Sequence, residues 1–259
     1  MMFRFDHRIF VIGGIALLWC IAPVAADEPF KRSALSPFFE SKSQPLPAKK
    51  TPPVAEKPTP AQLRECAARA EKAGDWETAF SAYCELPIVD RSAPEVREKV
   101  NASLRRVQQI RRHRDAGFQQ FVKGLASADA VNLFAEVTAK VPGMFADGSK
   151  ATPRQLWSHG VEELDRALAS PAFRQTFLDN SQAAKIEAFR TSLRSHWSKR
   201  TIVDSREART ALKQLLAAAQ DQFTVRVPAV LAIEFICGAC SGLDEYTVFL
   251  NPAQLAEAP

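Results

Sequence analysis

The chain has 259 residues, of which 46% are hydrophobic and 24% are charged, and its formal net charge is +5. This balance excludes a chain that is disordered throughout, and the length suits one sizeable domain or two small ones. Only 10 residues are Gly, whereas Ala, Leu, Arg, Glu and Gln are frequent, so the composition favours helices over strands. We therefore expect an all-α protein.

The first 26 residues have the composition of an export signal. Arg4 and Arg8 precede an uncharged apolar run over residues 9–24, and small residues end the run at Ala26. We expect cleavage after Ala26, which would place the mature protein in the periplasm or another extracytoplasmic space. The run is also long enough that an uncleaved membrane anchor is the alternative.

Residues 27–58 are rich in Pro, Ser and Lys and show no apolar period of a helix or a strand. Such a segment buries too little apolar surface to offset its chain entropy, and its prolines favour extended conformations. The sequence predicts a disordered linker that tethers the rest of the chain.

Five helix starts follow the linker. Three combine a capping side chain, Pro at the first helical position and Gln three residues after the cap, and two combine Ser or Asp with a Glu three residues later. The five caps are Thr59, Ser92, Thr152, Asp204 and Asn251. Between them, apolar residues recur at helical intervals, as in Trp157, Val161, Leu164 and Leu168 and in Ile186, Phe189, Leu193 and Trp197. We expect a helical bundle or a stacked array of helical hairpins.

Residues 66–87 predict the first helical hairpin. Gly74 and Asp75 separate two helical patterns, and three residues occupy positions that resemble those of a tetratricopeptide helix pair: Trp76, Ala79 and Tyr83. Since a solenoid needs about three repeats, this unit predicts the opening hairpin of a helical domain rather than a peptide-binding array. We expect the hairpin and a long helix over 59–125 and a further helical domain over 126–250.

Four cysteines follow the export signal in two pairs. Cys66 and Cys84 lie on the two predicted helices of the hairpin and could form a disulfide in an oxidising compartment. Cys237 and Cys240 lie in an apolar segment without the strand-to-helix context of a redox site, the His of a haem site or the second ligand pair of a zinc site. We interpret them as buried residues of a packed helix that a disulfide could also join. We expect no cofactor and no metal.

The histidines and arginines predict neither catalysis nor nucleic-acid binding. No nucleophile, base and orienting acid can be assembled around the four histidines: His7, His113, His159 and His196. The arginine-rich run over 105–114 has the composition of a nucleic-acid patch, but export argues against that partner. We interpret the run as a solvated helix face, with attraction to anionic lipid as the alternative.

The segment Leu-Asp-Glu-Tyr-Thr-Val-Phe-Leu-Asn-Pro, residues 243–252, resembles a family signature. Carboxyl-terminal processing (tail-specific) peptidases commonly carry Leu-Asp-Pro-(His/Tyr)-(Ser/Thr)-x-Tyr-Leu-x-Pro where their helical N-terminal region leads into a PDZ domain. Here Glu245 replaces Pro and Phe249 replaces Tyr. The residues that carry the resemblance are Leu243, Asp244, Tyr246, Thr247, Phe249, Leu250 and Pro252. Residues 126–250 are similar, more weakly, to the helices that precede this signature.

The resemblance implies a role without catalysis. The family uses a Ser nucleophile and a Lys base on a domain that follows the PDZ module, and no Ser or Lys of this chain matches those positions. It therefore implies the helical N-terminal region of an exported serine peptidase, inactive alone, with residues 251–259 starting the next segment and the missing peptidase domains as partners. A free-standing exported helical adaptor that binds protein or peptide partners is the alternative.

Overall fold

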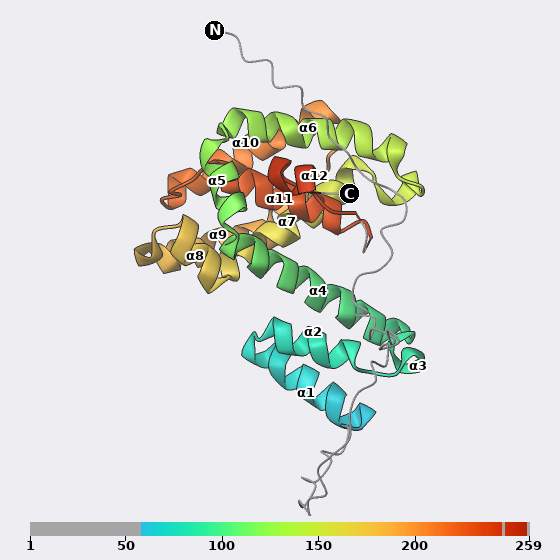
Figure 1. The fold of residues 1–259 in the computed structure, drawn as a ribbon. Coiled ribbons are helices and arrows are strands. Elements are labelled where there is room, and N and C mark those ends of the chain that lie inside the picture. The colour runs from blue at the N-terminus through green and yellow to red at the C-terminus, as the bar shows by residue number, and fades with distance from the viewer. Residues whose placement is uncertain (1–57, 245–246, 258–259) are drawn as a thin grey trace, which may run out of the picture.

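The computed structural model describes residues 58–244 and 247–257 (Figure 1). The predicted export signal, nearly all of the predicted linker, and Tyr246 of the family signature lie outside these residues. Within them the regular structure is helical, no strand occurs, and a single antiparallel bridge joins Leu178 to Val225. The expected all-α class is confirmed for this part of the chain.

The α-helices of the described residues are α1 (Pro60–Ala73), α2 (Trp76–Cys84), α3 (Ile88–Arg91), α4 (Pro94–Arg114), α5 (Ala116–Gly124), α6 (Ser127–Met144), α7 (Pro153–Ala169), α8 (Pro171–Phe177), α9 (Ala183–Ser195), α10 (Ser205–Gln222), α11 (Ala229–Ser241) and α12 (Pro252–Glu257). Three short 3-10 helices lie between them: η1 (Gly148–Lys150), η2 (Asn180–Gln182) and η3 (Trp197–Lys199).

The helices α1 and α2 form the predicted hairpin. Gly74 adopts a φ of 74°, a left-handed conformation that glycine enters without steric cost, and it ends α1. The next residue, Asp75, caps α2 by accepting a hydrogen bond from the backbone N–H of Thr78 at 3.1 Å. A two-residue turn therefore reverses the chain.

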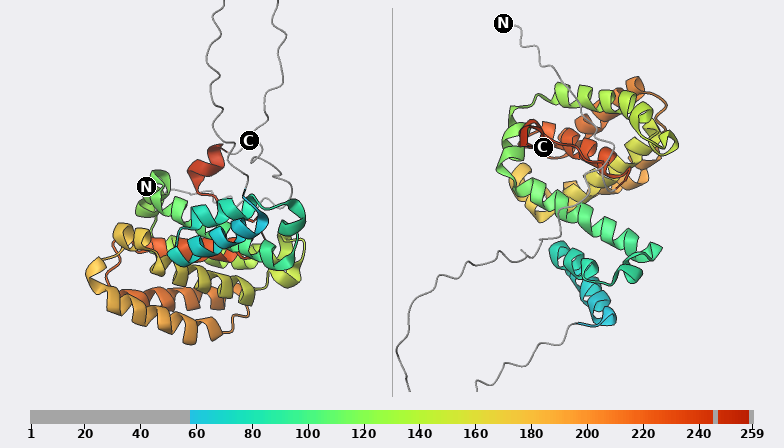
Figure 2. Two further views of the ribbon diagram at one scale, coloured as in Figure 1. Left: turned by 90° about the horizontal axis from the view of Figure 1, so that it is seen from below. Right: turned by 45° about the vertical axis from the view of Figure 1, so that its right-hand side comes forward.

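The long helix α4 connects the hairpin to the larger helical body (Figures 1 and 2). A small hydrophobic cluster lies under the hairpin, and Val96 and Val100 from the first half of α4 pack against it. A larger cluster begins at Phe118 in α5 and continues to Cys240 in α11. The two hydrophobic clusters are thus joined through α4.

The central element of the larger body is α11. All of its residues from Ala229 to Cys240 are buried, and it packs against α5, α6, α7 and α10. A helix enclosed on every side needs no polar face, which explains why this segment is apolar without a helical period. The core therefore surrounds α11, and only the C-terminal end of this helix reaches the surface.

Four of the five predicted helix starts have the expected cap. Thr59 and Thr152 form complete capping boxes with the Gln residues three positions later. The backbone N–H groups of Glu207 and Gln254 donate to the side chains of Asp204 and Asn251 at 2.8 and 3.0 Å. The apolar face at 157–168 is buried as predicted; in the second set Trp197 lies beyond α9, in η3, and remains buried.

The predicted cap at Ser92 is wrong. The helix α4 begins at Pro94 with Ala93 as its N-cap, and the Ser92 hydroxyl instead donates to the carbonyl of Ile88 at 2.8 Å. The reason is the proline, because a residue that precedes Pro is disfavoured in the helical conformation. Ala93 accordingly stays extended, so the helix starts one residue later than a Ser92 cap would require.

Candidate binding cleft

A buried ionic cluster fixes α4 against α7 and α11. Arg112 in α4 donates through Nε to Oε1 of Glu234 at 2.9 Å and through Nη2 to Oε2 at 2.8 Å. The same Nη2 lies 3.2 Å from Oε1 of Glu163 in α7. Gln109, one turn earlier, donates through Nε2 to that Glu163 oxygen at 2.9 Å. Bidentate pairing of this kind sets both the distance and the orientation of the helices.

The charges of this cluster stay ionised because they lie together. Burial by itself raises the pKa of Glu234, but attraction to Arg112 and His113 outweighs it and holds this pKa well below its ordinary value. For Arg112, burial acts to lower the pKa, but attraction and hydrogen bonding to Glu234 and attraction to Glu163 raise it well above the ordinary value. The Glu234 side chain is 0% exposed, so solvent screens this pair little.

The arginine-rich run is therefore not a uniformly solvated helix face. Arg112 lies in the cluster, and His113 is buried with its ring centroid 4.9 Å from that of Phe173 and its Nε2 3.2 Å from Oε2 of Glu234. Arg114 is exposed, as predicted. Periodicity within α4 carried no sign of the two glutamates, since they lie 51 and 122 residues away in the sequence.

Glycines bring α7 and α11 close together. A Cβ on Gly238 would lie 2.2 Å from the Cβ of Glu163, and a Cβ on Gly160 would lie 2.2 Å from the ring of Phe235. At the end of α11, Gly242 faces His159, whose pKa is lowered by burial. The C-terminal end of α11 thus packs on His159 of α7, and on its other side it faces α4.

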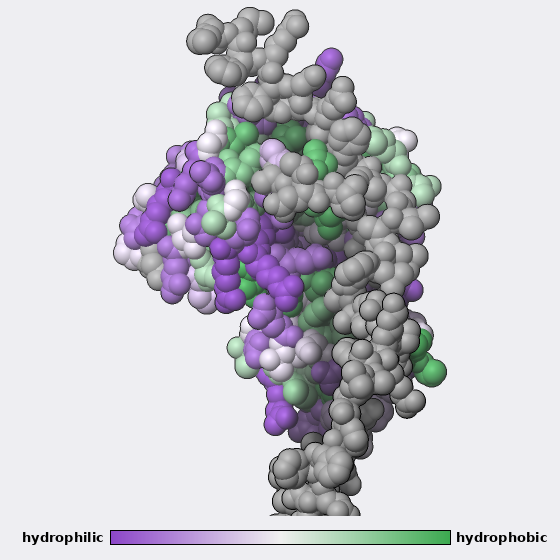
Figure 3. All heavy atoms as spheres, in the orientation of Figure 1, coloured by the Kyte–Doolittle hydropathy of each residue, from purple (hydrophilic) through white to green (hydrophobic). Residues whose placement is uncertain are grey.

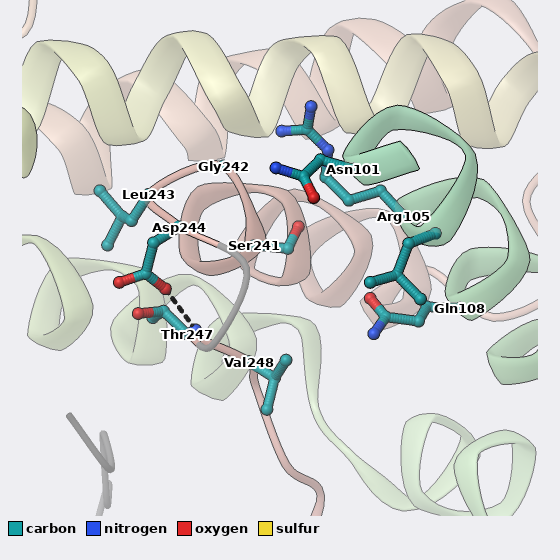
Figure 4. A pocket seen from close by; sticks show the side chains of 10 residues that line it. Asn101, Arg105, Gln108, Ser241, Gly242, Leu243, Asp244, Thr247 and Val248 are labelled. Carbon is teal, nitrogen blue, oxygen red and sulfur yellow. Dashed lines mark hydrogen bonds between the residues drawn. The ribbon is translucent and has the colours of Figure 1, made fainter. Parts of the chain in front are cut away.

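A cleft lies between α4 and the segment that follows α11 (Figure 4). It has a volume of about 160 Å³, and α4 supplies Asn101, Leu104, Arg105 and Gln108 to its wall. The opposite wall comes from residues 241–244 and 247–248. A second hollow of about 340 Å³ continues along α4 towards α3, and the two share Asn101 and Arg105.

Four of the polar side chains that line the cleft are not engaged by other described residues. Among the described residues, the side chains of Asn101, Arg105, Gln108 and Ser241 make no hydrogen bond or ion pair, although all four are half-buried. Figure 4 shows Asn101 and Arg105 on the α4 wall of the cleft and Ser241 on the opposite wall. One guanidinium, two amides and a hydroxyl are thus available to a ligand.

The signature-like segment, residues 243–252, lines the second wall of the cleft through residues 243, 244, 247 and 248. Its later residues pack elsewhere on the helical body. The carboxylate of Asp244 accepts a hydrogen bond from the backbone N–H of Thr247 at 2.6 Å, and Thr247 is buried. Phe249 packs against Phe121 of α5 with ring centroids 6.4 Å apart. Leu243 packs on the core and Leu250 is half-buried, and Pro252 begins α12.

The cysteines lie in the two places that the sequence indicated. Cys66 and Cys84 are half-buried on α1 and α2, and Cys237 and Cys240 are buried on α11. Cys66, Cys237 and Cys240 are free thiols, so neither candidate disulfide is formed in this structure. Burial raises the pKa of the Cys240 thiol to about 12 and that of Cys237 further. At neutral pH both are protonated and are therefore poor nucleophiles.

The side chains that line the cleft offer hydrogen-bond donors and acceptors to a ligand. A serine nucleophile needs a base within hydrogen-bond reach, and the Ser241 hydroxyl has no hydrogen-bond partner within 58–244 and 247–257. Over that same part of the chain, no three His, Cys, Asp or Glu side chains are grouped as metal ligands. None of the helices described here is long and apolar enough to cross a bilayer.

Comparison with known proteins gives no match: no family model, no curated protein and no solved structure is significantly similar to the chain.

Proposed function

We propose that this chain is the non-catalytic helical N-terminal region of an exported protein of the carboxyl-terminal processing peptidase type. The observation that carries the proposal is the packing of the signature-like segment on the helical body. Thr247 and Asn251 are buried, Phe249 packs on α5, and Asn251 caps the start of α12. These contacts fix where the chain leaves the helical body, which is the position that the resemblance gives to this segment.

Other features support the same role. The hairpin α1–α2, with Ala79 and Tyr83 in its core and Trp76 beside Arg106, supports the tetratricopeptide-like interpretation of the opening unit. The export signal expected over 1–26 would deliver the protein outside the cytoplasm, and the linker would give the helical body reach from that point. In this role the helical region positions protein substrates or the peptidase domains, and the chemistry belongs to a Ser/Lys domain.

The test is the size and sequence of the native gene product. The transcript is sequenced beyond codon 259 in every forward frame, and an antibody against residues 59–250 measures the size of the native protein. The proposal requires a continuation that encodes a PDZ-like module and a Ser/Lys-bearing domain, and a native protein well above 28.6 kDa. A native protein of 28.6 kDa followed by unrelated DNA would overturn it.

A second candidate function is supported by the cleft. A free-standing exported adaptor would bind protein or peptide partners through a concave surface with unpaired polar side chains. Asn101, Arg105 and Gln108 provide such a surface beside α11. This role requires only the described helices and would survive the failure of the peptidase proposal.

A further inference from the structure

Residues 194–213 carry much of the net positive charge of the chain. They contain six basic and two acidic residues, which gives a formal net charge of +4, while the whole chain has +5. This stretch runs from the last turn of α9 through η3 into α10. Its basic side chains together are called the basic face: Arg194, Lys199, Arg200, Arg206, Arg209 and Lys213.

The basic face is continuous from η3 to α10. Arg206, Arg209 and Lys213 recur at intervals of three and four, so they share one side of α10, and all three are exposed. The buried residues of this helix lie on its other side. Arg200 donates from Nη1 to Oε1 of Gln214 at 2.7 Å, which places the end of η3 beside the part of α10 that carries Lys213.

The acidic side chains of the neighbouring helices are used by other basic residues. The helices that contact α10 or η3 are α6, α7, α9 and α11. Their acidic residues that pair with Arg or Lys are Glu136, Glu162, Glu163, Asp165, Glu187 and Glu234. In the described parts of these helices, Asp129 in the first turn of α6 is the one acidic residue outside such pairs.

Most of the basic face therefore keeps its charge unpaired. Arg194 lies 4.0 Å from Asp165, an acid that Arg190 already binds at 2.9 Å. Within 58–244 and 247–257, four side chains of the basic face make no hydrogen bond or ion pair: those of Lys199, Arg206, Arg209 and Lys213. An exposed surface of this kind attracts anionic partners.

An apolar side chain lies in the middle of the basic face. Val203 connects η3 to α10 and is 74% exposed, whereas the preceding Ile202 is buried. The backbone N–H of Val203 donates to Oε2 of Glu207 at 2.9 Å, and Asp204 caps α10. These hydrogen bonds hold the turn, and both acidic residues are already counted in the net charge of +4. The result is a fixed apolar side chain between Lys and Arg residues.

The exposed apolar residues of α3 lack this surrounding. Ile88 and Val89 are 73% and 86% exposed, and an apolar patch lies at the position of α3 in Figure 3. The same short helix contains one acidic and one basic residue, Asp90 and Arg91, so its charges balance. An exposed apolar side chain and an excess of positive charge therefore coincide at Val203 and not at α3.

We propose that the basic face, with Val203 at its centre, binds the surface of an anionic lipid bilayer. Peripheral binding to such a surface combines attraction of Lys and Arg to lipid phosphates with burial of apolar side chains at the headgroup level. Neither of the two hollows along α4 reaches the basic face, and a bilayer needs no cleft. The expected export argues against nucleic acid as the partner. The inference requires neither an uncleaved export signal nor a downstream catalytic domain.

The test is cosedimentation with large unilamellar vesicles, made of phosphatidylcholine alone or of equal parts phosphatidylcholine and phosphatidylglycerol. The protein is the chain from residue 27 onward, because the apolar run over 9–24 would itself enter a bilayer. Both hydrophobic clusters lie after residue 58, so this chain keeps them, and circular dichroism checks that it is helical. We expect it to sediment with the anionic vesicles and not with the neutral ones. Added salt should release it, because salt screens exposed charges.

Matched triple variants locate the binding surface. Arg206→Gln, Arg209→Gln and Lys213→Gln together should weaken binding about a hundredfold at low salt, from roughly fivefold for each basic residue near an anionic surface. The control triple is Arg69→Gln, Lys72→Gln and Arg97→Gln, which removes the same charge from exposed positions in and beside the hairpin. It should weaken binding much less.

A substitution at Val203 tests the apolar contact. Val203→Trp should strengthen binding to the anionic vesicles several-fold, because indole side chains favour the membrane interface. The proposal is overturned by a chain that does not sediment with anionic vesicles, by equal sedimentation with both kinds of vesicle, or by equal losses in the two triple variants. Val203→Trp that binds no more tightly than the parent would remove Val203 from the contact. Tighter binding to a duplex DNA oligonucleotide than to the anionic vesicles would overturn the proposal in favour of nucleic acid.

Discussion

Among individual residues, Arg112 determines how α4 sits on the body. Taking its guanidinium and the Glu234 carboxylate out of water costs several kcal/mol per ion in proteins generally. That cost is recovered only with good geometry, and the two hydrogen bonds of 2.8 and 2.9 Å provide it. The pair adds modestly to net stability, but removal of one partner leaves a buried charge without its counter-ion.

Glu234→Gln should therefore lower the free energy of unfolding at pH 7 by about 3–5 kcal/mol, as measured by urea denaturation. The matched control is Glu162→Gln. Glu162 pairs with Arg166 at 3.1 Å, but its side chain is 53% exposed, so its loss should cost at most about 1 kcal/mol. Equal effects of the two substitutions would show that the buried pair does not anchor α4.

The difference in unfolding free energy between the parent protein and Glu234→Gln should depend on pH, and the pKa of Glu234 gives the sign of that dependence. The folded-state pKa of Glu234 is depressed below its ordinary value of 4.5. Its contribution to stability is thus fully present above about pH 4.5 and is lost as the pH falls through the folded-state pKa. The stability difference between the parent and Glu234→Gln should shrink when denaturation is repeated at successively lower pH. A difference that grows on acidification would contradict this assignment.

The sequence predicts local contacts of single residues better than distant ones. The caps at Thr59, Thr152 and Asp204 were predicted because donor and acceptor lie within three residues of each other. Arg112 was misjudged because its partners come from α7 and α11. The cleft residues Asn101, Arg105 and Gln108 also went unpredicted, although their common spacing along α4 was a signal present in the sequence.

At the scale of elements, the approach of α7 to α11 depends on residues without side chains. A glycine inside an α-helix lowers the stability of the helix by up to about 1 kcal/mol relative to Ala. Gly160 and Gly238 therefore weaken α7 and α11 taken by themselves. The benefit is a contact that brings Glu163 and Glu234 within reach of the same arginine. A sequence pattern identifies these glycines as unfavourable for a helix but does not reveal which helix approaches them.

Gly238→Ala should destabilise the protein by about 1–3 kcal/mol, the usual range for overpacking. The added Cβ would lie 2.2 Å from the Cβ of Glu163 and 2.7 Å from the carbonyl oxygen of His159, so one of the helices must move. Gly143→Ala is the control, because Gly143 lies near the end of α6 with no atom within 4 Å of an added Cβ. It should be neutral or stabilising by up to about 1 kcal/mol. Thermal unfolding followed by circular dichroism measures both, and a stabilised Gly238→Ala would refute the close contact.

The sequence largely predicted where helices occur along the chain. It did not predict which helices pack against one another. Amphipathic segments such as α7 revealed both their type and their buried face through the spacing of Trp157 and Leu164. The enclosed α11 revealed only that it is apolar, since burial on all sides removes the period that would indicate an orientation. The position of the cleft depends on the end of α11, so sequence patterns could not place it.

At the scale of the whole molecule, two hydrophobic clusters of unequal size share one connecting helix. The cluster under the hairpin contains few buried side chains, among them Leu63, Tyr83 and Leu86. Its polar link to α4 includes Lys99 and Glu71, 3.1 Å apart, with the Lys99 side chain 50% exposed. Exposed pairs contribute little, so the hairpin has much less to hold it than the body around α11.

This asymmetry predicts the order of opening. Native-state hydrogen exchange should show the amides of α1 and α2 exchanging through a sub-global opening of lower free energy than that of α7 and α11. The apolar contacts of the hairpin with α4 are at Val96 and Val100, ahead of the buried cluster at Gln109 and Arg112. Opening of the hairpin should therefore leave the amides of α11 protected. Glu234→Gln should then lower the protection of α7 and α11 more than that of the hairpin. Identical opening free energies across α1, α2 and α11 would instead show that α4 couples the two clusters into one cooperative unit.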